Sequence, residues 1–216
     1  MDASCSGAKD KPIALLVDDD INVSEAMSDL LNSVGIETLS FASAREVLEA
    51  KLPDRPSCFV LDVRMPGLSG LDLQRHLQSN GINTPIVFLT GHGDIAMSVE
   101  AMKAGAVDFL TKPVRDQTFL DVVSNAIATD QARREATRAS RMHSADYETL
   151  TLRERQVLRA VVSGALNKQI AYELGISEIT VKLHRSNMMK KMHANSLSQL
   201  FTVWQALPES VRRGDD

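Results

Sequence analysis

The sequence predicts two domains: an α/β domain built on a doubly wound, five-stranded parallel sheet, and after it a small all-α helix-turn-helix domain. Five short apolar runs alternate with helical patterns in the first part of the chain, which is the order expected of consecutive βα units. Beyond Thr151 the helical patterns continue without another strand-like run. The chain has 216 residues, 44% of them hydrophobic, and is therefore long enough to bury two cores.

The five expected strands are short runs bounded by polar residues, as is typical of strands buried in a parallel sheet. They span residues 13–17, 37–41, 58–61, 86–89 and 107–110.

The helices between these strands carry their own start and stop signals. An apolar repeat over residues 23–34 stops at Gly35, a residue typical of helix ends. Ser43 and Glu46 have the spacing of a capping box that opens a second helix. Three further helices are expected at residues 70–77, from Asp94 to about Ala104, and from Asp116.

The fifth helix has no clear stop, because residues 131–141 are rich in alanine and arginine and contain neither Gly nor Pro. We therefore expect it to run on as a polar helical linker. The predicted organisation is an α/β domain at 11–128, a linker at 129–146 and a helical domain at 147–211. The last contains four helices, at residues 152–162, 167–174, 177–192 and 196–207.

Charge and composition narrow the functional classes. The formal net charge is −4, but acidic residues dominate up to about Asp130 and basic residues dominate from Leu150 to Arg213. A basic surplus alone is weak support for a polyanionic partner. The polar start of the chain and the lack of a run of roughly 18 apolar residues predict a cytoplasmic protein without a membrane span. Cys5 and Cys58 do not suggest a disulfide framework.

Five chemically active residues lie at or just after strand ends. Because the carboxyl ends of parallel strands meet in one crevice, their side chains are expected to come together. Asp62 is the candidate nucleophile, since a carboxylate accepts a phosphoryl group when a cation offsets its charge. Asp18 and Asp19 are candidate Mg²⁺ ligands, while Thr90 and Lys112 supply a hydroxyl and a positive charge for the phosphoryl oxygens.

Two neighbours of these residues have simpler interpretations. Asp20 is more simply a capping or solvated residue than a direct metal ligand. His92 lacks a second His or Cys at ligand spacing, so we interpret it as a loop residue, although it could modulate hydrolysis of an aspartyl phosphate.

The first domain resembles the flavodoxin-like receiver domain of bacterial response regulators. The resemblance implies that Asp62 accepts a phosphoryl group from a sensor histidine kinase, that Asp18 and Asp19 bind Mg²⁺, and that the backbone carbonyl of Arg64 completes the metal shell. It also implies a switch formed by Thr90 and Phe109, although Phe109 could simply be a core residue. The matching motifs are Val17-Asp-Asp-Asp20, Leu61-Asp-Val-Arg-Met-Pro-Gly67, Leu89-Thr-Gly-His-Gly-Asp94 and Leu110-Thr-Lys-Pro113.

The helical domain has the pattern of a helix-turn-helix: a helix over residues 167–174, Gly175, and a second helix. A capping box, Thr151 with Glu154, opens the helix before it. On the second helix, Val181, Met188 and Met192 share one face and are most simply core. The opposite face carries Leu183, Ser186 and Lys190, flanked by Lys182 and Asn187. This mixture of apolar and basic residues suits a helix that lies in the major groove of DNA. The alternative is a solvent-exposed face that carries one leucine without a function.

Residues 150–206 resemble the LuxR-type helix-turn-helix, through Leu150-Thr-Leu-Arg-Glu-Arg-Gln-Val157, Asn167-Lys-Gln-Ile-Ala171 and Thr180-Val-Lys-Leu-His-Arg185. The whole chain thus resembles the NarL/FixJ family of response regulators, and its FixJ-like branch most. The resemblance implies that Lys182, Leu183 and Ser186 read base edges and that Thr180, Lys190 and Lys191 contact phosphates. Ser186 replaces a basic residue of some members, and His184 and Arg185 could pack or contact DNA.

The predicted function is a transcription factor controlled by phosphorylation. Its predicted partners are a histidine kinase, promoter DNA and a second copy of the chain after phosphorylation, with RNA polymerase a candidate. Two alternative functions fit the sequence less well. An aspartyl-phosphate phosphatase would commonly carry a second aspartate where this chain has Arg64. A phosphorylation-independent DNA-binding or scaffold protein would normally lack one of the five site residues.

Overall fold

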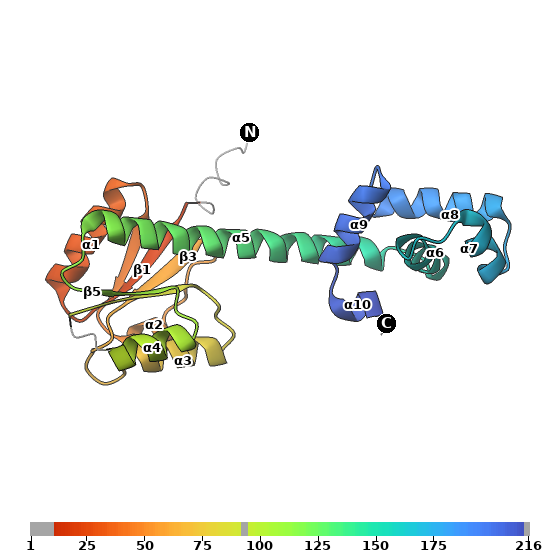
Figure 1. Ribbon diagram of the computed structural model, residues 1–216. Coiled ribbons are helices and arrows are strands. Elements are labelled where there is room, and N and C mark those ends of the chain that lie inside the picture. Colours follow the sequence, from red (N-terminus) through yellow and green to blue (C-terminus); the bar gives the residue numbers. More distant parts are fainter. Residues whose placement is uncertain (1–10, 92–94, 214–216) are drawn as a thin grey trace. The chain divides into compact units, whose positions relative to one another are not determined.

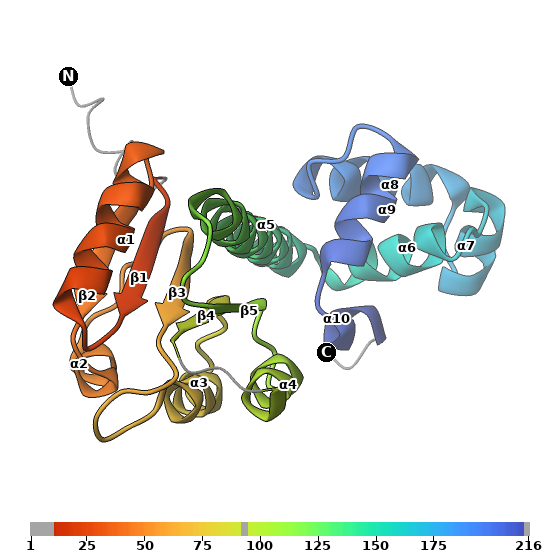
Figure 2. The same cartoon turned by 60° about the vertical axis from the view of Figure 1, so that its left-hand side comes forward.

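The computed structural model describes residues 11–91 and 95–213. The chain divides into two compact units, Met1–Arg134 and Glu135–Asp216; most of their elements are labelled in Figure 1, and Figure 2 also labels β2 and β4. Each unit has a hydrophobic core of its own.

The first unit is built on five parallel strands in the order β2-β1-β3-β4-β5. This order, with crossovers in both directions from β1, is that of a doubly wound sheet, so the predicted fold class is confirmed. The strands are β1 (Ile13–Val17), β2 (Glu37–Phe41), β3 (Ser57–Leu61), β4 (Ile86–Thr90) and β5 (Asp108–Thr111).

Helices cover both faces of the sheet, as Figure 2 shows. Side chains alternate along β1, so Leu16 packs with Leu31 and Phe119 on one face, and Leu15 packs with Leu73 on the other. The first face carries α1 (Ile21–Ser33) and α5 (Asp116–Glu148). The second carries α2 (Ala44–Glu49), α3 (Gly70–Ser79) and α4 (Ile95–Lys103).

Strand ends differ from the sequence prediction by one residue, and one difference concerns the site. Thr90 belongs to β4 because it pairs with Thr111 of β5, which extends the sheet by one row toward its carboxyl edge. β5 begins at Asp108, which pairs with Val87, rather than at Val107. The predicted cap of α4, Asp94, and also His92 lie outside the described residues.

Local hydrogen bonds explain where the first helices begin. The Asp20 carboxylate accepts from the backbone N–H of Asn22 at 2.9 Å and caps α1, which confirms the capping interpretation. Ser43 caps α2 by accepting from the Glu46 N–H at 3.3 Å. The Glu46 carboxylate accepts from the N–H of Ala42 at 3.0 Å, so it reaches one residue beyond the N-cap of the expected capping box.

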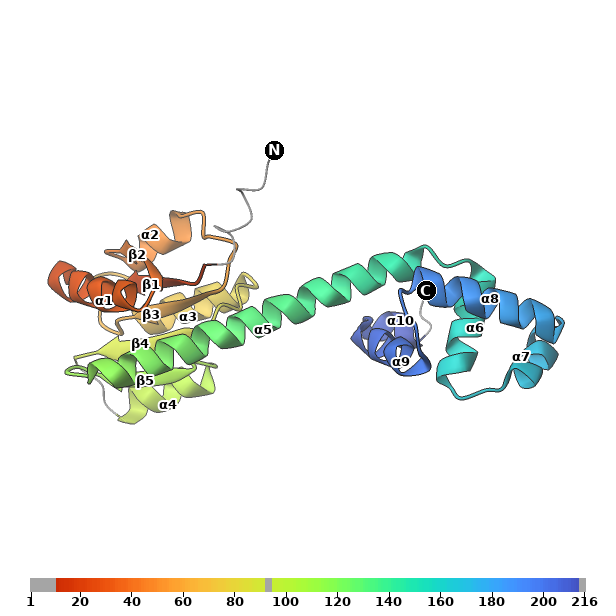
Figure 3. The same ribbon diagram turned by 90° about the horizontal axis from the view of Figure 1, so that it is seen from above.

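Helix α5 runs without a break from Asp116 to Glu148, 33 residues, and is drawn as one continuous coil in Figure 3. The expectation that the linker is helical is thereby confirmed. Among the described residues no helix is both long and apolar enough to cross a membrane.

Besides the end of α5, the described part of the second unit contains the four predicted helices and one more. They are α6 (Leu152–Val162), α7 (Asn167–Leu174), α8 (Glu178–Lys191), α9 (Leu197–Ala206) and the unpredicted α10 (Glu209–Arg213). The capping box of Thr151 and Glu154 is present. Gly175 ends α7 with φ +65°, a left-handed conformation that suits glycine, and so makes the turn into α8.

Candidate functional site

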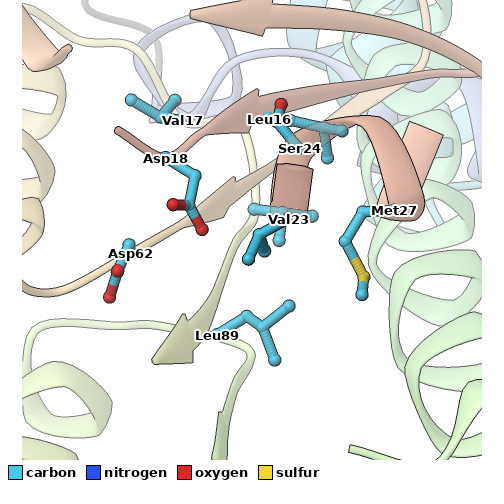
Figure 4. A pocket seen from close by; sticks show the side chains of 9 residues that line it. Leu16, Val17, Asp18, Val23, Ser24, Met27, Asp62 and Leu89 are labelled. Atoms are coloured by element: carbon cyan, nitrogen blue, oxygen red, sulfur yellow. The ribbon is translucent and has the colours of Figure 1, made fainter. Parts of the chain in front are cut away.

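The five predicted site residues meet at the carboxyl edge of the sheet. β1 and β3 are neighbours, with Val17 paired to Leu61, so Asp18 and Asp62 leave adjacent strands side by side (Figure 4). Thr90 is the last residue of β4, and its carbonyl accepts from the backbone N–H of Lys112 at 2.8 Å. The parallel topology therefore brings the strand ends to one edge of the sheet, as the sequence pattern predicted.

Three carboxylates lie close together, and the ammonium group of Lys112 lies beside two of them. One oxygen each of Asp18, Asp19 and Asp62 lies within 4.8 Å of the other two. The Lys112 Nζ is 2.6 Å from Asp18 Oδ2 and 3.8 Å from Asp62 Oδ2. A single lysine cannot balance three negative charges, so the cluster attracts a further cation.

The donor set fits Mg²⁺ in particular. Hard divalent cations prefer carboxylate and carbonyl oxygens, and Mg²⁺ commonly uses one or two carboxylates and keeps several waters. Asp18 is 9% exposed, whereas Asp19 is exposed, so the cluster has a buried side and an open side.

Asp62 has the position of a nucleophile. Its side chain is 13% exposed, and its Oδ1 accepts from the backbone N–H of Arg64 at 3.3 Å, while Oδ2 faces Lys112. Behind Asp18 and Asp62, toward α1, lies a cavity of only about 10 Å³ that is lined largely by apolar side chains (Figure 4). A cavity of this size holds about one water, so a phosphoryl donor has to approach from the open side.

The two predicted switch residues lie on neighbouring strands. Thr90 is fully buried. Phe109 is half-buried on β5, paired in register with Phe88, and the two rings are 6.0 Å apart between centroids. Phe109 packs against the core of the first unit, which is the arrangement of a core residue, and its role as a switch stays a prediction.

Gly70, which the sequence predicts only as the start of a helix, is a condition for the geometry of the site. A Cβ atom at Gly70 would lie 2.2 Å from the backbone carbonyl oxygen of Asp62. Only glycine therefore lets the first turn of α3 approach the backbone of Asp62, the candidate nucleophile. The available signal was a glycine eight positions after Asp62, directly behind the Ser69 N-cap.

The second candidate site is the outer face of α8. Val181, Met188 and Met192 are fully buried, as the periodicity predicted. Lys182, Leu183, Ser186 and Lys190 are exposed, and Thr180 and Asn187 are half-buried. The described structure thus gathers most of the predicted DNA-contact residues on the face opposite the core.

Lys191 is placed differently from the other predicted phosphate contacts. Its Nζ donates to Glu154 Oε2 at 2.7 Å and to the Thr149 carbonyl at 3.1 Å. Burial of Glu154 favours the neutral acid, but hydrogen bonds from Lys191 and Thr151 outweigh it and lower the pKa of Glu154. Arg185 donates to Asn167 Oδ1 at 3.1 Å, which supports packing for this residue.

Each unit matches a known protein family. Residues 14–124 match the response regulator receiver domain, and residues 148–204 match the bacterial regulatory proteins of the luxR family. This chain belongs to the NarL/FixJ family of response regulators. It is a two-component response regulator with a receiver domain and a LuxR-type DNA-binding domain.

Relatives match along most of the chain. Nodulation protein W of Bradyrhizobium diazoefficiens is 51% identical over 200 residues, which are 93% of this chain and 88% of the relative. The structure of response regulator StyR has a TM-score of 0.80 at 45% identity and covers 90% of this chain and 98% of its own. Full-length FixJ from B. japonicum has a TM-score of 0.55 at 36% identity, covering 91% and 97%.

Proposed function

We propose that this regulator is a transcription factor switched by phosphorylation of Asp62, with a sensor histidine kinase as the phosphoryl donor. A carboxylate oxygen of Asp62 forms a bond to phosphorus while the bond from phosphorus to the donor's histidine nitrogen breaks, and the nitrogen keeps the electron pair. Asp18, Asp19, Asp62 and the Arg64 carbonyl would hold Mg²⁺, whose charge would offset that of the phosphoryl oxygens. Lys112 and Thr90 would contact those oxygens.

One observation carries this proposal: oxygens of three carboxylates lie within 4.8 Å of one another at the open edge of the sheet, and Lys112 lies beside two of them. Such crowding destabilises the metal-free protein, and a divalent cation followed by a phosphoryl group relieves it. Lys112 lies within 4 Å of both Asp18 and Asp62, so a small movement would transfer its ammonium from one acid to the phosphoryl group.

The test is incubation of the full chain with acetyl phosphate and Mg²⁺. We expect one acid-stable, base-labile phosphate per chain, none with Asp62→Asn, and none after chelation of Mg²⁺. Asp54→Asn is the matched control, because Asp54 is 99% exposed at the far end of β3. Incorporation by Asp62→Asn at the wild-type rate would refute the assignment.

We further propose that phosphorylation draws Thr90 toward the phosphoryl group, changes the rotamer of Phe109 and promotes homodimerisation. A stripe of exposed apolar side chains on α4 supports this step: Ile95, Val99 and Met102 are 83%, 45% and 46% exposed. They recur at helical spacing on one face. Joining two DNA-binding domains raises avidity by roughly 10²–10⁴ without any new contact.

Ultracentrifugation with and without beryllofluoride tests the dimer switch, and we expect the mass to double with it. An unchanged monomer mass together with unchanged DNA affinity would contradict the proposal. Tighter DNA binding by a fragment of residues 150–216 would instead favour release of inhibition.

For the DNA-binding domain we propose that Lys182, Leu183 and Ser186 read bases, with Asn187 beside them, and that Thr180, Lys190 and Lys191 contact phosphates. Lys190 is the stronger phosphate candidate, because Lys191 is held by Glu154. Lys182→Ala should lose about 1–3 kcal/mol of discrimination, whereas Lys190→Ala should weaken all duplexes alike and reduce the salt slope by about one. RNA polymerase remains a candidate partner.

Titration of selected and scrambled duplexes across salt concentrations separates these roles. Equal loss on both duplexes for Lys182→Ala would assign it to the backbone instead.

A further inference from the structure

The first turn of α8 carries an exposed apolar side chain that no contact in the described structure explains. Ile179 is the second residue of α8 and is 79% exposed. Single exposed apolar residues are common on protein surfaces, so exposure alone assigns nothing. The informative observation is the position of Ile179 relative to the other residues of the same helix.

Ile179 lies in line with the outer face of α8. At about 100° per residue, Ile179, Leu183, Ser186 and Lys190 fall within about 60° of one another, opposite the buried Val181 and Met188. Ile179 and Leu183 are one turn apart and 79% and 58% exposed. They form a two-residue apolar patch, which continues into Ser186 and Lys190 and has Lys182 at its side.

The surroundings of the patch identify its occupant. Lys182 and Lys190 are both exposed, so the face is basic as well as apolar, which matches a duplex whose grooves are lined by phosphates. In helix-turn-helix proteins the N-terminal residues of the second helix meet base edges. The apolar group that a base edge offers in the major groove is the methyl group of thymine.

We propose that Ile179 is a specificity-determining residue, which together with Leu183 contacts the methyl groups of two nearby thymines. The two side chains are about 6 Å apart along the helix axis, and successive bases of one strand are about 3.4 Å apart. The two thymines are therefore expected one to two base steps apart. This inference rests on the proposed DNA-binding function and adds a base preference to it.

The test begins with duplexes selected from a random pool by the full-length, beryllofluoride-activated protein. Each thymine of the selected site is then replaced in turn by deoxyuridine, which lacks only the methyl group. We expect at least one replacement to cost wild-type protein about fourfold in affinity, the factor for burying roughly one carbon group. At that position Ile179→Ala should bind the thymine duplex and the deoxyuridine duplex equally. Leu183→Ala should lose the preference for thymine over deoxyuridine at a second position, one to two base steps away.

Two variants, one at the proposed contact and one as a control, are compared. Ile179→Ala replaces an exposed residue with a better helix former, so α8 is expected to stay folded. Leu152→Ala, also at an exposed apolar residue of this unit (72%) but on α6, should keep the wild-type pattern. Retention of every thymine preference by Ile179→Ala, or no preference in wild-type protein, would overturn the inference while specific binding stands. Failure to select any sequence would overturn the proposed function, and this inference with it.

Discussion

The two ends of β3 each hold an acid beside basic side chains, but the two arrangements differ in how the acid is used. At the amino end, Asp130 of α5 is fully buried; its Oδ2 accepts from the Ser57 N–H at 3.0 Å and from Arg134 Nε at 2.6 Å, and its Oδ1 is bound by Arg133. At the carboxyl end, Asp62 lies beside two other carboxylates and shares Lys112 with one of them, Asp18.

This difference separates a structural acid from the acid that we propose to be reactive. Asp130 has donors on both oxygens, so its charge is satisfied and it fastens α5 to the start of β3. Burial opposes the charged form of Arg134, but its hydrogen bonds to Asp130 and Asp54 prevail and raise the pKa of Arg134. Burial, reinforced by the negative charge of Asp130, raises the pKa of Cys58 to about 12, so its thiol stays protonated and unreactive at neutral pH.

The largest effect should come from breaking the satisfied cluster. Asp130→Asn removes the buried negative charge that Arg133 and Arg134 share, and removing one member of a buried ion pair costs roughly 3–5 kcal/mol. We expect urea unfolding of the first unit, followed by far-ultraviolet circular dichroism, to shift by this amount. Fluorescence of Trp204, the single tryptophan and a residue of the second unit, should report a separate transition that does not shift.

Asp54→Asn is the matched control for this cluster, because it removes the 99% exposed partner of Arg134 and should cost less than about 1 kcal/mol. Asp130→Asn should still incorporate phosphate at the wild-type level under folding conditions. An unchanged unfolding midpoint would show that the buried acid is not a structural anchor.

The same contrast explains what could be predicted from the sequence. The site residues follow strand patterns, and parallel topology alone brings strand ends together. Asp130 carried no such signal, because its partner Ser57 is 73 positions away in the sequence and an aspartate in a polar linker is normally solvated. Gly70 was missed as a site residue for a related reason: a 2.2 Å approach to Asp62 is a property of packing between elements.

In the second unit, too, contacts between elements could not be predicted from the sequence. Periodicity identified the faces of α8, but it could not predict that Lys191 turns toward Glu154, an ion pair between α8 and α6. It also gave no reason to include Ile179 among the DNA contacts, since the apolar pattern begins with the core residue Val181.

A second effect should appear only at the carboxyl end of β3. The proposed Mg²⁺ site exists only in the folded protein, so Mg²⁺ at one hundred times its Kd should stabilise the first unit by about 2.7 kcal/mol. We expect this gain in wild-type protein and in Asp130→Asn, and little of it in Asp18→Asn. Urea unfolding in EDTA and in Mg²⁺, with Ca²⁺ as a comparison ion, measures this gain in unfolding free energy. An equal gain in Asp18→Asn would mean that the metal binds elsewhere.

The ion pair of Glu154 and Lys191 extends the comparison to the second unit, since Glu154 is also buried and satisfied. Its folded pKa lies below the usual 4.5. The resulting stability is therefore present above pH 4.5 and is lost as pH falls through the folded value. Glu154→Gln should lower the unfolding free energy of this unit by about 2 kcal/mol at pH 7.

Trp204 fluorescence during urea unfolding at pH 7 and at pH 3 measures this difference. The variant should approach the wild type at the lower pH, because protonation of Glu154 removes the stability that its charged form gives the folded state. A difference that does not narrow with falling pH would assign the effect to packing rather than charge.

The smallest effect has the opposite sign and tests the comparison most directly. Asp19 is exposed and has an oxygen within 4.8 Å of Asp18 and Asp62, so Asp19→Asn removes like-charge repulsion of about 1 kcal/mol at this separation in water. In EDTA and low salt the variant should therefore be more stable than wild type, although Asp130→Asn is less stable. Added salt should shrink the gain through screening, and added Mg²⁺ should reverse the order by stabilising wild type more. A loss of stability in EDTA would mean that Asp19, like Asp130, is retained for the fold rather than for the phosphoryl site.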